Sequence, residues 1–423
     1  MCIRGVVAMK KILPLSLTIA AITGLISISH AGVGQSAVIT LLFPYGARSY
    51  AMGDIGTALA DDASALYFNP AGLDVPNERF IGGCGTWFWE PLLPAFGLRE
   101  LWHTALAANI QVPDFYWCSP GVFFNFINMG INNWQDELGR DRGSSRSWES
   151  VMALGAGFNF KDVGILNHYF GLTAKYIVSA LAPGIGGYGT GVGKGFAVDF
   201  GYLWTIGRNF RFGATAMNMG PPIYYIDPEK SDPIPFAINL ALAYKNELLI
   251  EGLRYFAVAG EFRADREVVK NYIDKQPDPF YKAIWTDLLH DKDETAAFEL
   301  WQFNEHLGGE ITVLNTLSWR NGYLIDVAGE RYEYHYGIGI SALNHLSLDF
   351  GNIYSPEGFM RGFARLFDRH KTGASGARHN QWQISLTLSR ALYWNDNDFE
   401  WWKVRDTTPP QKRRKRDDGT FRL

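Results

Sequence analysis

The stretch "GFAVDFGYLWTIG", Gly195–Gly207, decides the fold class, because its side chains alternate in character from one position to the next. Successive side chains of an extended strand point to opposite faces. One face would be apolar throughout, with Phe196, Val198, Phe200, Tyr202, Trp204 and Ile206. The other would be mostly small or polar, and it includes Ala197, Asp199, Gly201 and Thr205. The stretch therefore predicts a long strand with two contrasting faces.

Four more stretches repeat this alternation, at residues 171–182, 210–220, 235–246 and 380–394. The second of them follows a short Gly-Arg-Asn turn and predicts a hairpin with the first stretch. Strands of about nine to eleven residues with an apolar outside, a polar or tiny inside and aromatic ends suit a transmembrane barrel. The alternative, a soluble β-sandwich, needs large side chains on its inner face, where this chain has Lys175, Asp199 and Arg211. We predict an all-β transmembrane barrel.

Residues 1–31 have the anatomy of a secretory signal peptide. Two lysines precede an apolar run, Ile12–Ile28, and Ser29-His30-Ala31 forms a small-residue exit; translation starts at either Met1 or Met9.

Beyond the predicted signal peptide, no apolar run reaches the ~18 residues that a membrane-spanning helix needs. The chain has 14 Trp, 20 Tyr, 28 Phe and 45 Gly, which favours an exported β-protein. A net charge of -4 gives no basic excess for a nucleic-acid partner.

The segment 32–78 precedes the predicted barrel, 79–394, and is dense in small residues. "ARSYAM" before Gly53 predicts one short helix, and "DDASALYF" predicts a second that begins at Asp61 or Asp62 and ends at Asn69-Pro70. Two such helices would form a plug, or hatch, that fits inside a lumen. Asn69 precedes a proline, so we expect it to be extended and to hold the hatch against the wall. The alternative is that these polar residues are only caps and turns.

Several stretches, in this order, resemble the FadL-like outer-membrane barrels, and specifically their PorV/PorQ branch. In "GARSYAMGDIGTALADDASALYFNPAGL", 46–73, the matching positions of the hatch motif are Gly46, Met52, Gly53, Asp61, Asp62, Ser64, Asn69 and Pro70. Similar segments follow at 93–108, 123–140, 171–182, 194–204 and 308–355. The resemblance covers the chain from about Gly46 to about Tyr393. It departs at Gly72, where PorV usually has a lysine and FadL is closer.

The resemblance implies a barrel of about fourteen antiparallel strands with an N-terminal helical hatch, in the outer membrane. In the PorV branch such barrels serve the type IX secretion system, where they receive secreted cargo proteins and work with other secretion-system subunits. In the FadL branch they pass hydrophobic small molecules, such as long-chain fatty acids, across the outer membrane. We take the PorV role as the main expectation and passive transport as the alternative. Outer-membrane lipid is a partner in both.

Residues 265–309 read as a polar, partly helical loop insertion, which PorV-like proteins carry at this place. Within it, one apolar face at helical spacing is predicted from Phe280, Tyr281, Ile284, Trp285 and Leu288. This face either docks a partner or packs on the barrel rim. After Tyr393 and Trp394, residues 395–423 read as a polar, basic tail.

The sequence predicts no enzyme, cofactor or metal site. The histidines are scattered, without a His-Glu-x-x-His spacing, and Gly-x-Ser-x-Gly does not occur. Glu333 with His335, and Ser347 with Asp349, lie two residues apart, and we interpret them as lumen-facing polar ladders. Whether Cys84 and Cys118 form a disulfide is left open by the sequence.

Overall fold

The structure of the chain is a computed structural model, and it describes residues 36–75, 83–92, 100–110, 118–135, 138–160, 164–184, 191–250, 253–272, 276–288, 302–326, 331–342, 346–354 and 380–390. The predicted signal peptide, 1–31, and the predicted tail, 395–423, lie outside these ranges. Tyr393 and Trp394 also lie outside them.

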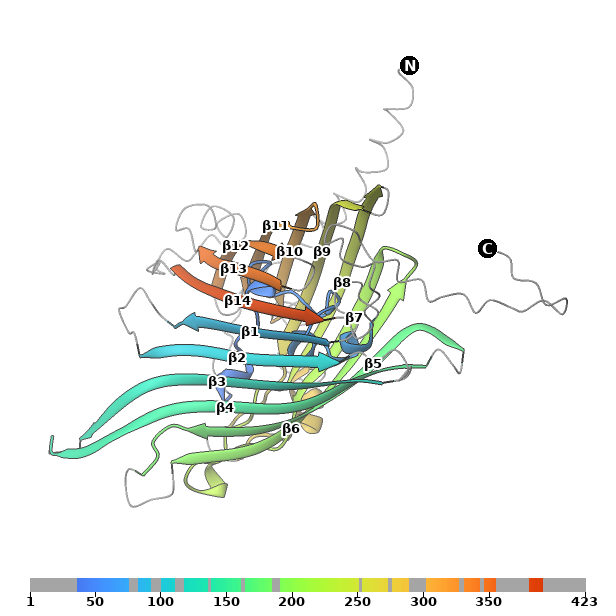
Figure 1. The fold of residues 1–423 in the computed structure, drawn as a ribbon. Coiled ribbons are helices and arrows are strands. Elements are labelled where there is room, and N and C mark those ends of the chain that lie inside the picture. The colour runs from blue at the N-terminus through green and yellow to red at the C-terminus, as the bar shows by residue number, and fades with distance from the viewer. Residues whose placement is uncertain are drawn as a thin grey trace, which may run out of the picture.

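Within the described ranges, fourteen antiparallel strands close into a barrel in which each strand pairs with its neighbours in sequence and β14 pairs with β1 (Figure 1). The strands are β1 (Gly83–Pro91), β2 (Leu101–Ile110), β3 (Cys118–Gln135), β4 (Asp141–Phe160), β5 (Ile165–Ala180), β6 (Val192–Ile206), β7 (Phe210–Met219), β8 (Ala237–Ile250), β9 (Leu253–Glu267), β10 (Asn304–Val313), β11 (Leu317–Asp326), β12 (Arg331–Ala342), β13 (Leu346–Tyr354) and β14 (Asn380–Arg390). This confirms the predicted barrel.

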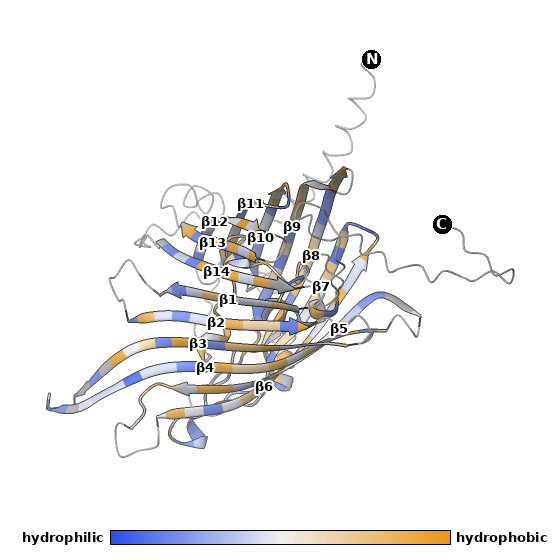
Figure 2. Cartoon of the chain, viewed as in Figure 1, coloured by the Kyte–Doolittle hydropathy of each residue, from blue (hydrophilic) through white to orange (hydrophobic). Residues whose placement is uncertain are grey.

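The two faces of β6 are those that the alternation predicts. Phe196 is 66% exposed on the outside, whereas Asp199 is 0% exposed on the inside. β6 pairs with β7 from Ile206↔Phe210, which confirms the predicted hairpin. Apolar and polar positions alternate along many of the other strands as well (Figure 2). In β6, the inner face therefore carries mostly polar and small side chains, and the outer face is apolar.

The ends of the barrel differ in the length of their connections. At one end, which we call the turn end, β1 begins and β14 ends, and connections such as 207–209 and 314–316 are short. At the opposite loop end, residues 220–236 join β7 to β8, and residues 268–303 join β9 to β10.

The predicted insertion, 265–309, is wrong at both of its boundaries. β9 continues to Glu267 and β10 already begins at Asn304. The end of β9 reads as a polar loop because its lumen face is charged: Asp265 lies 2.7 Å from both Arg263 Nη2 and His306 Nε2. Between the strands, the structure has helix α4 (Phe280–Ala283) and a π-helical turn, η6 (Ile284–Leu288).

Residues 36–75, the described part of the segment before β1, contain four short helices: η1 (Ile39–Leu41), α2 (Ala47–Tyr50), α3 (Ala65–Phe68) and η2 (Pro70–Asp74). A fifth, η5 (Pro228–Lys230), lies in the β7–β8 loop. In the part of the chain that the structure describes, no helix combines the length and the apolar character needed to cross a membrane.

Candidate functional site

The described part of the N-terminal segment, residues 36–75, lies inside the barrel, and we call it the hatch. Near its start, the Ala37 amide donates to the Pro233 carbonyl in the β7–β8 loop, at 2.8 Å. Near its end, Asp74 accepts from Ser119 Oγ at 2.5 Å, at the turn-end start of β3. The hatch thus runs through the interior from the loop end to the turn end.

Glycines on the wall allow the hatch backbone to approach closely. A Cβ added at Gly308 of β10 would lie 1.9 Å from the Met52 carbonyl oxygen, and one at Gly322 of β11 would lie 2.1 Å from the Met52 carbonyl carbon. On the other side of the barrel, a Cβ at Gly171 of β5 would lie 2.2 Å from the carbonyl carbon of Pro70. Non-bonded heavy atoms do not approach one another this closely, so only glycine fits at these positions.

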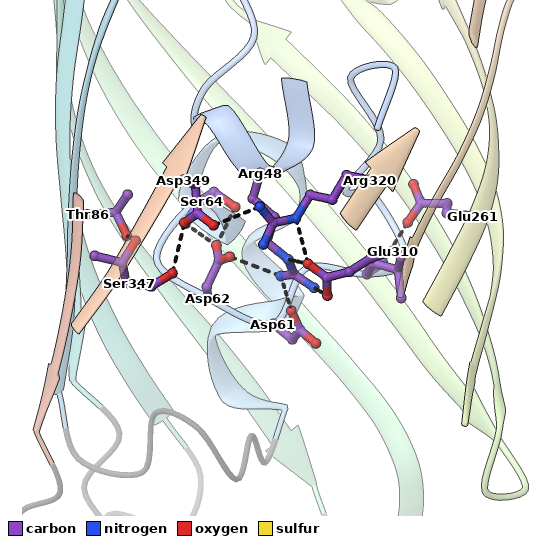
Figure 3. A network of polar contacts seen from close by, with 12 residues as sticks. Arg48, Asp61, Asp62, Ser64, Thr86, Glu261, Glu310, Arg320, Ser347 and Asp349 are labelled. Carbon is purple, nitrogen blue, oxygen red and sulfur yellow. Dashed lines mark hydrogen bonds and ion pairs between the residues drawn. The ribbon is translucent and has the colours of Figure 1, made fainter. Parts of the chain in front are cut away.

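An ionic network joins the hatch to one side of the wall (Figure 3). Arg48 of α2 contacts Asp61 at 2.7 Å and Asp62 at 3.1 Å within the hatch, and Glu310 of β10 at 3.3 Å. Arg320 of β11 then contacts Glu310 at 2.6 Å and Asp349 of β13 at 2.7 Å. Each of the four carboxylates contacts at least one of the two arginines, and a buried charge without a partner would be costly.

Asp61 extends the network to the adjacent side of the wall. Lys245 of β8 lies 3.0 Å from Asp61, and Arg211 of β7 lies 3.9 Å from it. Burial alone would favour the protonated acid, but Arg48, Lys245 and Arg211 hold the pKa of Asp61 well below its usual range. Asp61 is therefore a charged cross-link between hatch and wall.

Neither Asp61 nor Asp62 begins helix α3, so this part of the sequence prediction is wrong. The N-cap is Ser64, which makes no side-chain cap hydrogen bond. Asp62 instead accepts hydrogen bonds from the Ser64 amide, at 2.8 Å, and from the Ser64 hydroxyl. The caps are displaced because Arg48 draws both carboxylates towards itself.

Glu261 of β9 receives a whole turn of the hatch backbone. Its two carboxylate oxygens accept the amides of four consecutive residues, 56–59, at 2.6 to 3.0 Å. Glu261 is 2% exposed. A carboxylate that accepts several backbone amides is held strongly, so Glu261 fixes the position of this turn.

Two histidines clamp the end of α2. His335 Nδ1 lies 2.6 Å from the Tyr50 carbonyl oxygen, and His306 Nδ1 lies 2.6 Å from that of Gly53. Glu333 orients His335 from the other ring nitrogen at 3.2 Å, which confirms the predicted polar ladder. Ser347 likewise donates to Asp349 at 3.0 Å. The sequence shows no sign of the histidine clamps, because their partners are backbone carbonyls some 250 or more residues away.

Asn69 connects the hatch to β6. Its amide nitrogen donates to the Thr57 carbonyl at 2.7 Å and to the Tyr202 carbonyl of β6 at 3.0 Å. Its oxygen accepts from the Ala71 amide at 3.1 Å, which caps η2. Asn69 is extended, with φ -163°, and is fully buried.

The remaining residues of the predicted hatch motif have structural roles. Gly46 is the N-cap of α2, with φ +90°, and Gly53 follows that helix with φ +77°. Met52 lies against the wall glycines, and Pro70 begins η2.

The wall opposite the ionic network is lined largely by apolar clusters. At the loop end, Val38 and Leu41 of the hatch pack with Val151, Ile177, Ala197, Ile223 and Ile234. Further in, hatch residues including Tyr45, Leu66 and Leu73 pack with Cys84, Phe88, Ala105, Ala107, Phe123 and Ala153 of β1–β4. At the turn end, Ala71 and Val75 pack with Tyr169 and Leu203. Buried polar groups, among them the Lys175–Asp199 ion pair at 2.7 Å, separate these clusters.

The predicted docking helix is divided between two environments. Phe280 and Ile284 pack against the barrel, whereas Tyr281 and Trp285 are 63% and 64% exposed. Leu288 is the last residue of η6.

Cys84 and Cys118 are free thiols, and β2 separates their strands. Among the described residues, no group of three His, Cys, Asp or Glu side chains could hold a metal ion.

No protein-family model matches the sequence, and neither does any curated protein sequence. Among solved structures, the Pseudomonas putida toluene transporter TodX is similar over 82% of this chain and 97% of that chain, with 13% identity and a TM-score of 0.46. The Ralstonia pickettii toluene transporter TbuX is similar over 81% and 97%, with 11% identity and a TM-score of 0.47. A Pseudomonas aeruginosa FadL homologue is similar over 81% and 98%, with 10% identity and a TM-score of 0.40. The finer resemblance to PorV stays a prediction from the sequence.

Proposed function

We propose that this protein is an outer-membrane channel through which hydrophobic small molecules pass, and that the hatch is its closure. The observation that carries the proposal is the distribution of hatch contacts: its ion pairs to the wall are made with β7, β8 and β10, whereas apolar clusters against β1–β6 follow it from the loop end to the turn end, interrupted by hydrogen bonds such as those of Asn69 and Asp74.

The membrane location is supported by the outer wall. Leu154, Trp319 and Phe196 are exposed by 68%, 65% and 66% on outward-facing positions. A closed barrel satisfies all of its backbone hydrogen bonds within itself, which a lipid environment demands. Barrels of the outer membrane have short periplasmic turns and longer outside loops, so the loop end faces outward and the turn end faces the periplasm.

The apolar side supports a hydrophobic solute. Apolar contacts have no directional requirement, so an apolar molecule can replace hatch contacts with Ile177 or Phe123 at little cost. A polar solute would have to lose water along the same path without regaining hydrogen bonds. On the opposite side, a displaced hatch would leave Glu310 and Asp349 with their Arg320 partner. A partial shift of the hatch away from β1–β6 would keep its ion pairs to Glu310 and Lys245, and it would break the hydrogen bonds of Asn69 to β6 and of Asp74 to β3.

The test is uptake by a bacterial host that lacks its own hydrophobic-compound channels. Cells that make this protein should accumulate a fluorescent long-chain fatty acid faster than cells with the empty vector, while uptake of a sugar of similar mass should not change. Equal uptake of both solutes would mean a general pore, and no uptake of either would refute transport.

The secretion role that the PorV resemblance implies predicts a different result. Deleting the gene from its own organism would then trap exported proteins with C-terminal sorting domains in the periplasm, with fatty-acid uptake unchanged. Normal secretion together with reduced uptake would support the channel.

A further inference from the structure

The segment Phe280–Leu288, which we call the rim segment, packs on the outside of the barrel. Phe280 and Ile284 lie in one cluster with Ala216 and Ile238 of the wall. Ile238 is on the same strand face as Leu240, which is 44% exposed on the outer wall. The residue between them, Asn239, points inward and bonds Thr215 Oγ1 at 2.7 Å. The rim segment therefore covers the outer wall at the loop end of β7–β9 and does not lie over the mouth.

Arg266 shows what the rim segment covers. It pairs with Ile238 in the β8–β9 register and so lies on the outer face, yet it is only 1% exposed. Its Nη2 donates to the Asp287 backbone carbonyl at 3.2 Å and to the Asp287 carboxylate at 3.4 Å. A charged side chain on the lipid face of a barrel is costly, and the rim segment removes it from that surface.

The side of the rim segment that faces away from the wall carries two large aromatic residues. Tyr281 and Trp285 are four residues apart, and both are more than 60% exposed. Lys282, beside them, binds Asp278 at 2.6 Å. Tyr and Trp have an apolar ring and a polar group, and they are enriched where a membrane meets water. The opposite side of the rim segment, with Phe280 and Ile284, packs on the outer wall at Ile238, two residues from the exposed Leu240.

We propose that the rim segment is a membrane anchor whose Tyr281 and Trp285 side chains lie in the interface of the outer leaflet, at the upper border of the apolar wall. The proposal rests on the membrane location given above and not on the transported solute. Lipid, rather than a protein, is the occupant because the exposed aromatic pair adjoins a wall that is itself lipid-facing.

The experiment places an environment-sensitive probe at single cysteines. In a background with Cys2→Ser, Cys84→Ala and Cys118→Ser, the probe NBD is attached to Tyr281→Cys or Trp285→Cys, and the protein is reconstituted in phosphatidylcholine vesicles. Two control positions are used: Leu240→Cys on the outer wall, and Glu229→Cys in the exposed helix η5. Quenching is measured with aqueous iodide, with a headgroup spin label and with a deep acyl-chain spin label.

We expect the probes at 281 and 285 to be quenched most by the headgroup label and at least threefold less by iodide than the probe at 229. The probe at 240 should be quenched most by the deep label. If 281 and 285 behave like 229, the rim segment faces water and the anchor is refuted. If the probe at 240 is also not quenched by either spin label, the proposed membrane location of the barrel is wrong. The two failures are therefore distinguishable.

Discussion

Arg48 Nε lies 3.3 Å from Glu310 Oε2, and this contact joins the hatch to the barrel wall across 262 residues of sequence. Arg48 also contacts Asp61 and Asp62; Asp61 is shared with Lys245 of β8, and Glu310 is shared with Arg320 of β11. Removing one partner of a buried ion pair leaves the other charge uncompensated, at a cost on the order of 3 kcal/mol. A single substitution at Arg48 therefore removes one hatch–wall ion pair and two ion pairs within the hatch.

Arg48→Met is therefore expected to loosen the hatch without opening the barrel strands. Single-channel recordings in planar bilayers should show frequent openings that the unaltered protein lacks, and the temperature of heat-dependent gel migration should change little. Arg208→Met, in the exposed β6–β7 turn, is the matched control and should behave like the unaltered protein. An unchanged recording for Arg48→Met would show that the other hatch contacts suffice.

Asn69→Leu should weaken the hatch at its junction with β6. The leucine leaves the Thr57 and Tyr202 carbonyls without their donor, and each unsatisfied buried group costs about 1–3 kcal/mol. We expect increased leakage of small solutes from loaded vesicles. Asn69→Asp separates two roles of the side chain, because it still accepts from the Ala71 amide but cannot donate to either carbonyl. If vesicles with Asn69→Asp leak no more than those with the unaltered protein, the hydrogen bond from the Ala71 amide is sufficient, and the hydrogen bond to the Tyr202 carbonyl of β6 is not needed to hold the hatch.

Gly322→Ala tests the close approach of hatch and wall. The added methyl group would lie 2.1 Å from the Met52 carbonyl carbon, so the hatch backbone must move. Overpacking of this kind typically costs about 1–3 kcal/mol. The expected result is faster cleavage of the hatch by an added protease. Gly85→Ala in β1, where the nearest atom is 3.8 Å away, should show no change. Similar cleavage of both variants would contradict the tight fit.

Residues 276–288, which comprise Asp278 and the rim segment, should lose protection from hydrogen exchange in acid. Asp278 accepts from Lys282 at 2.6 Å, from Tyr272 at 2.8 Å and from Thr286 at 2.9 Å. Burial favours the protonated acid, but the hydrogen bonds from Lys282, Tyr272 and Thr286 outweigh it and lower the pKa of Asp278.

Because this pKa is lower in the folded chain than in the unfolded one, ionised Asp278 stabilises the segment at neutral pH, and that stabilisation is lost as the pH falls through the folded pKa. Hydrogen exchange of residues 276–288, corrected for its intrinsic pH dependence, should accelerate in acid. Asp278→Asn should already exchange faster at neutral pH and respond less to acid. Equal pH responses of the two proteins would exclude Asp278 as the group responsible.

The barrel could be predicted from the sequence because strand periodicity is local. In β6, the positions of Phe196 and Asp199 alone indicate which face points outward and which points into the barrel. The contacts of the hatch could not be predicted, because they depend on the register of strands far away. Asp61 reads as a helix cap when only its neighbours are considered, and its true partners, Lys245 and Arg48, converge on it only in the closed barrel.

The hatch precedes every strand in the sequence, yet β14, the last strand, completes the wall around it. A wall that is hydrogen-bonded all the way round offers no side entrance to a folded segment. The hatch must therefore occupy the interior before β14 pairs with β1, or be drawn in through one end afterwards. If β14 joins last, assembly is a wrapping of late strands around an early segment, and a chain slow to dock its final strand would expose the hatch to proteases in the interval.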